Sequence, residues 1–275
     1  MKLKKKYSHN NKRQIFRLIP TDTGKIIIEE RDIEKKLAYF NCLHIDRGKK
    51  IFKHLQLDEK FWLGIEAIYN DVIFFHKFVK PDLPQHNGII AYDINHKRTI
   101  WENKNRTFLF VKDEKIYAFQ QRFEDREFVT LNYLTGEVID ELGIDSDAIN
   151  LLREDAINSE DFSGYHFPGS FGKNFFGEQR ENEILSKLHE EHKITGGIEY
   201  VLMEDLLLFN FHEVNIDNTL KNIFKAVDLS TGKYILEVTL NSRPNAFAPD
   251  SFFVKDDLLF LLIEKIKLEV YKIIN

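Results

Sequence analysis

Apolar strands joined by short polar turns recur along this chain of 275 residues. Five segments share the pattern of an apolar strand, a polar turn and a second apolar strand, and their second strands begin at residues 25, 71, 115, 205 and 257. The spacing is about 45 residues, with one interval about twice as long, as expected for a repeated structural unit. Strands separated by such short turns predict a β-hairpin in each segment.

A second hairpin follows each of the first four segments, over residues 44–52, 93–102, 132–139 and 228–237. Gly48, Gly136 and Gly232 occupy the turn in three copies, where glycine readily supplies the positive φ of a tight hairpin. Lys97 takes that place in the remaining copy, which predicts a variant turn. Four strands per unit of about 45 residues are typical of a β-propeller blade.

The hairpins in which Asp or Asn and a Thr-Gly pair come before an apolar strand, such as residues 228–237, resemble the repeats of quinoprotein-like and WD40-like β-propellers. The resemblance covers most of the chain outside residues 141–197. The chain also resembles an uncharacterised bacterial family of propellers of unknown function. This implies an all-β fold and leaves the function open, because propellers host many activities. The redox chemistry of true quinoproteins is not carried over, since their calcium, quinone and disulfide features are not visible in this sequence.

Residues 141–197 interrupt the repeats. Asp145 is a suitable cap for a helix through residues 149–152, and a second helix is expected from about residue 178 to 193. We therefore predict a single propeller domain over residues 14–275, with five blades of about four antiparallel strands and a helical insertion at about 141–197. The alternative is six blades with one degenerate blade. The last blade is expected either to have three strands or to take its closing strand from the N-terminal segment.

The composition agrees with a β-rich fold, since the chain has 24 Phe but only 6 Pro, and 43% of its residues are hydrophobic. A net charge of −5 argues against nucleic acid as a partner. Basic residues gather in residues 1–13, which we expect to form a disordered basic tail; binding of RNA or a membrane surface through its lysines is a weaker alternative. Cys42 is the only cysteine, and its strand-like setting predicts a small buried hydrophobe.

No apolar run reaches the length that crosses a bilayer, and no signal-peptide pattern follows the basic residues. We therefore expect no transmembrane segment and a cytoplasmic location.

Aligning the second strands of the five segments shows apolar residues at the second and fourth positions and mostly polar residues at the sixth and eighth. If these strand ends converge on one rim of the propeller, their polar side chains form a ligand-binding ring. The candidates are Glu30, His76, Gln120, Arg122, Asn210 and His212. The alternative is that the strands simply become polar where they leave the core.

The aromatic, glycine-rich loop at residues 161–172 is a candidate lid or partner surface, because long loops on rigid scaffolds often carry function. Its candidate residues are Tyr165, His166, Phe167 and Phe171, and the alternative is that these rings pack the insertion onto the propeller. His189 and His192 are three residues apart, which does not match the spacing of four in zinc-protease helices. We expect no metal and no cofactor.

These features favour a non-catalytic cytoplasmic module that binds a protein partner or a polar small molecule, or that acts as a scaffold. The alternative is a hydrolase or lyase acting on a polar small molecule such as a sugar, with Glu30, His76 and His212 as acid/base groups. No nucleotide-binding or nucleophile motif favours a specific reaction.

Overall fold

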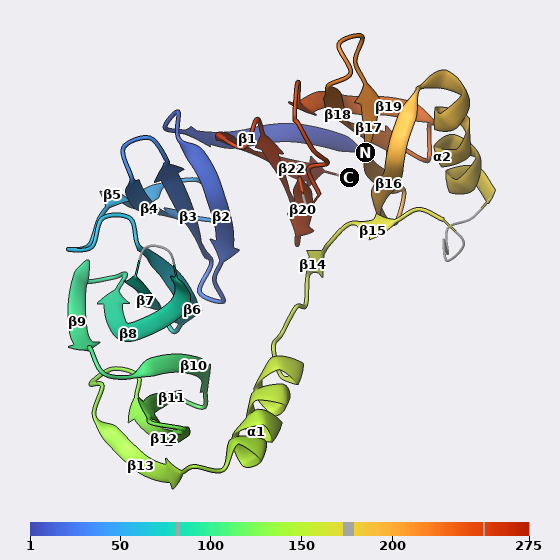
Figure 1. Cartoon of the computed structure of the whole chain (residues 1–275). Coiled ribbons are helices and arrows are strands. Elements are labelled where there is room, and N and C mark those ends of the chain that lie inside the picture. The colour runs from blue at the N-terminus through green and yellow to red at the C-terminus, as the bar shows by residue number, and fades with distance from the viewer. Residues whose placement is uncertain (81–82, 173–178, 250, 275) are drawn as a thin grey trace. The chain divides into compact units, whose positions relative to one another are not determined.

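Five sheets of four or five antiparallel strands and two helices make up this computed structural model, which describes residues 1–275 except 81–82, 173–178, 250 and 275 (Figure 1). The chain is therefore an all-β protein whose sheets are of the propeller-blade type, as the repeats predicted. Two compact units are distinguished, one of residues 15–161 and one of residues 1–14 together with 162–275. The predictions of a single domain and of five rather than six blades stay predictions.

The unit of residues 15–161 contains three four-stranded sheets, in each of which strands that follow one another along the chain pair as neighbours. The first sheet has β2 (Gln14–Pro20), β3 (Lys25–Asp32), β4 (Leu37–His44) and β5 (Lys50–Leu55). The second has β6 (Leu63–Tyr69), β7 (Val72–Lys80), β8 (Leu83–Asp93) and β9 (Arg98–Asn103). The third has β10 (Thr107–Lys112), β11 (Lys115–Arg122), β12 (Asp125–Asn132) and β13 (Val138–Gly143), and helix α1 (Ser146–Asn158) follows it.

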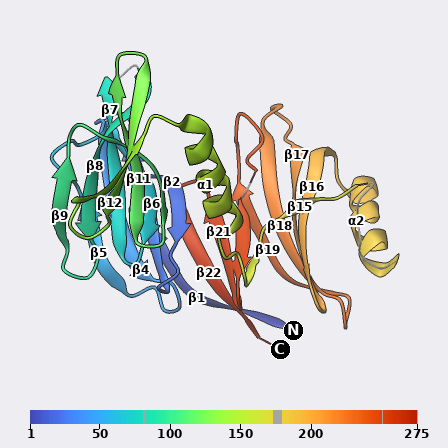
Figure 2. The same cartoon turned by 90° about the horizontal axis from the view of Figure 1, so that it is seen from below.

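The other unit contains two five-stranded sheets. One is ordered β1 (Lys2–Asn10), β22 (Lys267–Ile274), β21 (Leu258–Ile263), β20 (Phe252–Lys255) and β14 (Tyr165–His166). The second is ordered β15 (Gly169–Ser170), β16 (Ile194–Met203), β17 (Leu206–Val214), β18 (Leu220–Asp228) and β19 (Lys233–Asn241), and Figure 2 shows β16 to β19 running side by side.

Strand β1 corrects the expectation of a disordered basic tail. It pairs with β22 in antiparallel register, from Lys2 opposite Ile274 to Asn10 opposite Lys267. Leu3, Tyr7 and His9 turn inward while most of the lysines face solvent, so the strand is amphipathic despite its charge. The expected alternative, in which the N-terminal segment supplies the closing strand of the last sheet, is confirmed.

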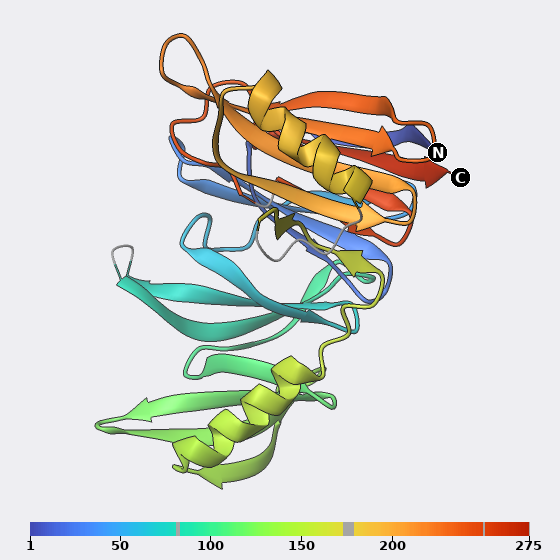
Figure 3. The same cartoon turned by 90° about the vertical axis from the view of Figure 1, so that its right-hand side faces the viewer.

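Residues 141–197 contain the two expected helices, but they are more than a helical insertion. The side chain of Asp145 caps α1 by accepting hydrogen bonds from the backbone N–H groups of Asp147 and Ala148, each at 3.1 Å. Helix α2 (Gln179–Glu191) lies across the sheet of β15 to β19 (Figure 3), where Leu185 and Leu188 are fully buried. The predicted start at residue 178 lies outside the described residues. Between the helices, β14 and β15 join one edge of each five-stranded sheet.

Packing between the sheets of residues 15–161 explains why their central strands are apolar on both faces. On β7, Phe75 packs with Phe40 and Cys42 of the first sheet, and the adjacent Phe74 packs with Ile116 of the third. Cys42 is fully buried, as expected, and burial raises the pKa of its thiol to about 12. No helix among the described residues is long and apolar enough to cross a membrane.

Candidate metal centre

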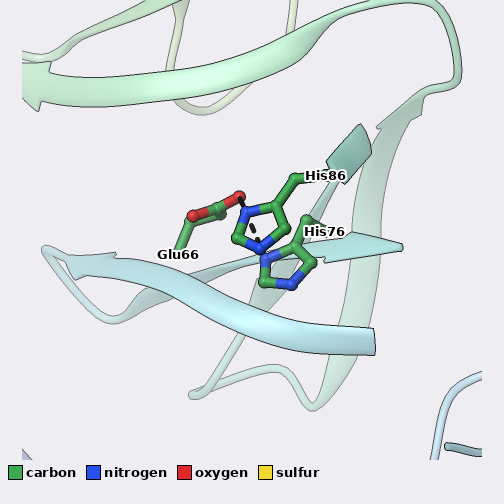
Figure 4. Close-up of side chains that lie close together, drawn as sticks. All are labelled: Glu66, His76 and His86. Carbon is green, nitrogen blue, oxygen red and sulfur yellow. Dashed lines mark hydrogen bonds and ion pairs between the residues drawn. The ribbon is translucent and has the colours of Figure 1, made fainter. Parts of the chain in front are cut away.

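Three side chains from neighbouring strands of the second sheet converge on one point (Figure 4). Glu66 comes from β6, His76 from β7 and His86 from β8. The Oε1 atom of Glu66 lies 3.0 Å from Nδ1 of His76 and 2.8 Å from Nδ1 of His86. One potential ligand atom from each residue lies within 4.8 Å of the others, and the described residues contain no second group of His, Cys, Asp and Glu with this geometry.

Irregularities in strand pairing bring these side chains together. The register between β6 and β7 shifts between Ile65 and Ala67, where Glu66 lies. The register between β7 and β8 shifts between Phe75 and Lys77, where His76 lies. Such bulges redirect a side chain relative to the regular alternation of a strand, and they are common next to functional sites.

The ring of His76 is the most enclosed part of the cluster, with only 4% of the residue exposed. It stacks on the ring of His86 at a centroid distance of 3.5 Å, and Phe78 packs edge-on against both rings. Neither ring nitrogen of His76 has a hydrogen-bond partner among the described residues, since the contact with Glu66 lacks hydrogen-bond geometry. A buried polar atom without a partner costs free energy, so this ring has an unused capacity to coordinate a ligand.

The charge on Glu66 suits a metal ligand. Burial alone raises the pKa of its carboxyl group, but the neighbouring imidazoles of His76 and His86 outweigh burial and hold that pKa below its usual value. The carboxylate therefore stays ionised at neutral pH. One carboxylate and two imidazoles form a donor set that suits zinc and other divalent transition metals.

Gly64 provides the space in which His76 sits. A Cβ atom added to Gly64 would lie 2.7 Å from Cε1 and 2.9 Å from Nε2 of His76. It would also lie 3.2 Å from Nη2 of Arg17, whose Nη1 donates a hydrogen bond to the carbonyl oxygen of Ile65. The absence of a side chain at Gly64 therefore leaves room for both the ring of His76 and the guanidinium of Arg17.

The six candidate rim residues occupy different settings. His76 belongs to the cluster just described, and Gln120 lines a polar cleft beside β11. Glu30 is fully buried on β3, whereas Arg122 is exposed and pairs with Glu127 at 3.0 Å. Their convergence on one rim stays a prediction.

Asn210 and His212 of β17 belong to a buried polar network in the unit that contains residues 162–275. The Nε2 atom of His212 accepts a hydrogen bond from the backbone N–H of Ala248 at 3.1 Å. The side chain of Asn210 donates to Asn222, which in turn donates to the carbonyl oxygen of Ala248 at 3.3 Å. These contacts fix the loop before β20 onto the sheet, which is a structural use of both side chains.

The candidate lid residues divide into packed and exposed members. Phe171 packs against the core beneath α2, as the alternative interpretation expected. Phe167 is 59% exposed and stacks on Tyr165 with ring centroids 5.6 Å apart. Tyr165, His166 and Phe167 also line a cleft of about 470 Å³. A lid or partner role for this segment stays a prediction.

Glu66 and His86 were not among the residues singled out from the sequence. A signal for Glu66 was present, because it is a carboxylate inside the apolar run of residues 65–69. His86 lies in a polar stretch and carries no comparable signal. His192 of the rejected histidine pair lies just beyond α2 and forms an ion pair with Glu213, which uses one of its ring nitrogens.

Residues 19–101 match the family described as Domain of unknown function (DUF4905). This span includes all three residues of the cluster, and the match confirms the predicted resemblance to a family of unknown function. No curated protein matches the sequence.

Two solved structures are similar to the chain. The first is a europium-containing methanol dehydrogenase, with 14% identity and a TM-score of 0.34 over 96% of this chain and 52% of the dehydrogenase. The chain thus spans about half the length of that protein. The second is Hsv2 of Kluyvelomyces marxianus, with 11% identity and a TM-score of 0.31 over 96% of this chain and 77% of Hsv2.

Proposed function

We propose that this chain is a metal-binding module in which Glu66, His76 and His86 hold one divalent transition-metal ion. A single observation carries the proposal: a carboxylate and two imidazoles lie within 4.8 Å of one another, and the buried ring of His76 has no hydrogen-bond partner among the described residues. A metal ion at this point would be coordinated by one of the two ring nitrogens of His76.

Zinc fits the donor set best. Calcium and magnesium prefer sites built from oxygen atoms, whereas imidazole nitrogen favours zinc, copper, iron and nickel. Zinc binds imidazole nitrogen and carboxylate oxygen at about 2.0–2.2 Å, which separates neighbouring ligand atoms by roughly 3.3 Å in a tetrahedral site. The carboxylate oxygen lies 2.8–3.0 Å from the two Nδ1 atoms, somewhat closer than this, and the two stacked rings would have to turn toward a shared ion to coordinate it.

Three protein ligands would leave the fourth position of a tetrahedral zinc ion open. A polar small molecule or a side chain of a partner protein could occupy that position, which supports the expected role as a binding module. We also propose, as part of this role as a binding module, that the chain is cytoplasmic and acts as a scaffold.

Metal-assisted hydrolysis is the second candidate function, because two histidines and one glutamate are also a ligand set of catalytic zinc. In this version His76 is a metal ligand, and an activated water replaces the acid/base groups first considered. His212 fits an acid/base role poorly, since its Nε2 already accepts a hydrogen bond from Ala248. Turnover of p-nitrophenyl acetate by the zinc-loaded chain, lost in His86→Ala, would favour hydrolysis over binding alone.

Isothermal titration of the full chain with zinc chloride tests the proposal. We expect one site per chain, and an affinity at least about tenfold weaker in His86→Ala, the usual scale for removing one metal ligand or its support. His96→Ala is the matched control, because His96 is an exposed histidine on the β8–β9 turn that pairs with Asp93 at 2.8 Å. Wild-type affinity in His86→Ala, or no stoichiometric zinc binding by the wild-type chain, would contradict the proposal.

Cobalt provides an independent readout of the ligands. A cobalt ion held by two imidazoles and a carboxylate in a four-coordinate site gives visible d–d absorption, whereas a loosely held hydrated ion gives almost none. We expect this absorption in the wild-type chain and in His96→Ala, and its loss in His86→Ala. Circular dichroism of each variant separates loss of the site from loss of the fold.

A further inference from the structure

A second site lies in the unit that contains residues 162–275, on residues that the metal centre does not use. It is a cleft of about 470 Å³, within the range of roughly 300–1,000 Å³ that is typical of small-molecule sites. Its lining includes Tyr165, His166 and Phe167 and residues 200–202 of β16, and we call it the aromatic cleft.

The aromatic cleft lies where two paired segments of the chain separate. Strand β15 follows the edge of β16 only as far as Gly169, which pairs with Tyr200. The preceding strand, β14, pairs instead with β20 in the other sheet of this unit. If the register of β15 continued, Phe167 would lie opposite Leu202, but the two residues do not pair. Both of them line the cleft, which is therefore the space left by the missing pair.

This separation leaves a backbone donor and a backbone acceptor unpaired. The N–H of Phe171 donates to the carbonyl oxygen of Ile198 at 2.8 Å, so Ile198 directs its backbone groups toward β15. Residues two positions apart along a strand direct their N–H and C=O groups to the same edge, so Tyr200 and Leu202 do the same. Gly169 pairs with Tyr200, whereas the N–H and C=O of Leu202 have no hydrogen-bond partner in the described part of the chain.

Aromatic rings give the cleft a stacking surface. Phe167 is 59% exposed, although its ring lies parallel to that of Tyr165 with centroids 5.6 Å apart. Phe162 packs edge-on against both rings, and the ring of Phe253 lies 6.3 Å from that of Phe167. These contacts order the ring of Phe167, so little conformational freedom is lost when a ligand stacks on it. Covering its exposed apolar surface would stabilise the complex.

Charge and hydrogen bonding narrow the class of ligand. The described residues that line the cleft include no lysine, arginine, aspartate or glutamate. A phosphate or a cation would therefore find no counter-charge there, which favours a neutral ligand. The N–H and C=O of one residue also require an acceptor and a donor next to each other on the ligand. A flat heterocycle of the nucleobase type has such an edge and also has a face that stacks on aromatic rings.

We infer that the aromatic cleft binds a neutral nucleobase-type heterocycle, with Phe167 as the stacking surface and the backbone of Leu202 as the hydrogen-bonding edge. The inference does not rest on the metal centre, whose three residues belong to the unit of residues 15–161.

Saturation-transfer NMR on the full chain tests the inference with adenine, hypoxanthine and theophylline, each of which carries an N–H donor beside an acceptor. We expect at least one of them to bind. Caffeine has the same flat shape as theophylline but no N–H group, so it should bind at least about tenfold more weakly than the best of the three, because the carbonyl oxygen of Leu202 would lack a donor. Equal binding of caffeine would overturn the inference.

Phe167→Ala should weaken the binding by about tenfold or more, the scale of a lost base–aromatic stack. Phe123→Ala is the matched control, because it removes another exposed phenylalanine ring, at the turn between β11 and β12, and should leave the binding unchanged. Thermal unfolding of both variants shows whether the fold is retained. Equal binding by Phe167→Ala and the wild type would contradict the inference.

Adenosine monophosphate is the competing probe. Its binding without binding of any of the three heterocycles would overturn the inference, because the site would then recognise charge. Binding of no probe at all would overturn it as well. Zinc titration of Phe167→Ala should match the wild type, which keeps this test separate from that of the metal centre.

Discussion

The imidazole rings of His76 and His86 lie face to face, with centroids 3.5 Å apart and planes 8° from parallel. The same carboxylate oxygen of Glu66 faces Nδ1 of both rings. Both rings therefore share one negatively charged partner, and a divalent ion bound by these side chains would require each ligating ring nitrogen to be free of a proton.

Gly64→Ala should disturb this arrangement directly. The added methyl group would lie 2.7 Å from the ring of His76, so the ring must move away from its present position. We expect zinc affinity to fall at least about tenfold, because a displaced ligand loses its coordination geometry. Titration calorimetry measures the change. In Gly197→Ala the new methyl group meets no atom within 4 Å, so equal losses in both variants would contradict the role assigned to Gly64.

Acid should weaken the sheet that contains β1 through Glu269. Burial raises the pKa of this carboxyl group, but hydrogen bonds from Lys267, Lys5 and Tyr271 outweigh burial and lower the pKa to about 2. The unfolded chain has an ordinary Glu pKa of about 4.3 and binds the proton first. The stabilisation is therefore complete above about pH 5 and is lost as the pH falls from there toward about 2.

Glu269→Gln should remove part of this dependence. We expect it to cost about 1–3 kcal/mol at pH 7, since hydrogen bonds to a charged group are lost, and to lose less stability than the wild type between pH 5 and pH 3. Urea unfolding at each pH measures both effects. If the variant loses as much unfolding free energy as the wild type between pH 5 and pH 3, other carboxyl groups account for the acid sensitivity.

Deletion of residues 1–10 tests whether this segment is a stabilising strand or a disordered tail. Without β1, the backbone groups of β22 lose their partners and the sheet gains an exposed edge. We expect the unfolding midpoint to fall by roughly 5–10 °C or more. Replacing the exposed Lys4 and Lys6 with Gln keeps the strand and should leave the midpoint nearly unchanged. A deletion as stable as the wild type would restore the disordered-tail interpretation.

His212→Gln tests whether this side chain is structural. Burial lowers the pKa of His212 below its ordinary value, so the unfolded chain binds the proton more readily. The wild type should therefore lose stability as the pH falls below about 6.5. Glutamine can still accept from Ala248 but does not titrate, so the variant should cost about 1 kcal/mol at pH 7.5 and change less between pH 7.5 and 5.5. Chemical unfolding at the two pH values gives the comparison.

Position 97, occupied by Lys97, should accept glycine with less backbone strain than any residue that has a side chain. It has a φ of 56°, in the same left-handed region as Gly48 at 65° and Gly136 at 72°. We expect Lys97→Gly to stabilise the chain by about 0.5 kcal/mol, because relief of backbone strain exceeds the added freedom of the unfolded chain. Lys97→Val should destabilise it by about 1 kcal/mol, since a β-branched residue fits this conformation poorly. Thermal unfolding of both variants would reveal the opposite signs.

The positive φ of Lys97 bears on how much of the hairpin structure could be predicted from the repeats. The hairpins follow from local alternation, and the glycine turns adopt the predicted positive φ. Lys97 adopts a positive φ as well, although a residue with a side chain does not favour it, and the variant turn stays a prediction.

The features that the sequence did not predict depend on pairing between strands that are far apart along the chain or whose register shifts. Strand β1 pairs with a partner more than 250 residues away along the chain, so the sequence offered it only as one of two ways to complete the last sheet. Glu66 and His86 lie on the two strands that flank His76, and the pairing registers of these strands, with their shifts beside Glu66 and His76, have no local sequence signal. His76 was found because the ends of repeated strands could be aligned, whereas its two partners lie on strands that the alignment did not include.

The pairing of β1 with β22 has a consequence for synthesis. Among the strands described here, β1 is synthesised first and its hydrogen-bonding partner β22 last. Until that partner emerges, the edge of β1 must be shielded by solvent, by its own lysine charges or by a chaperone. The final sheet can therefore close only after translation of the strand at Lys267–Ile274, which makes its assembly a late and slow step with a large loop to close.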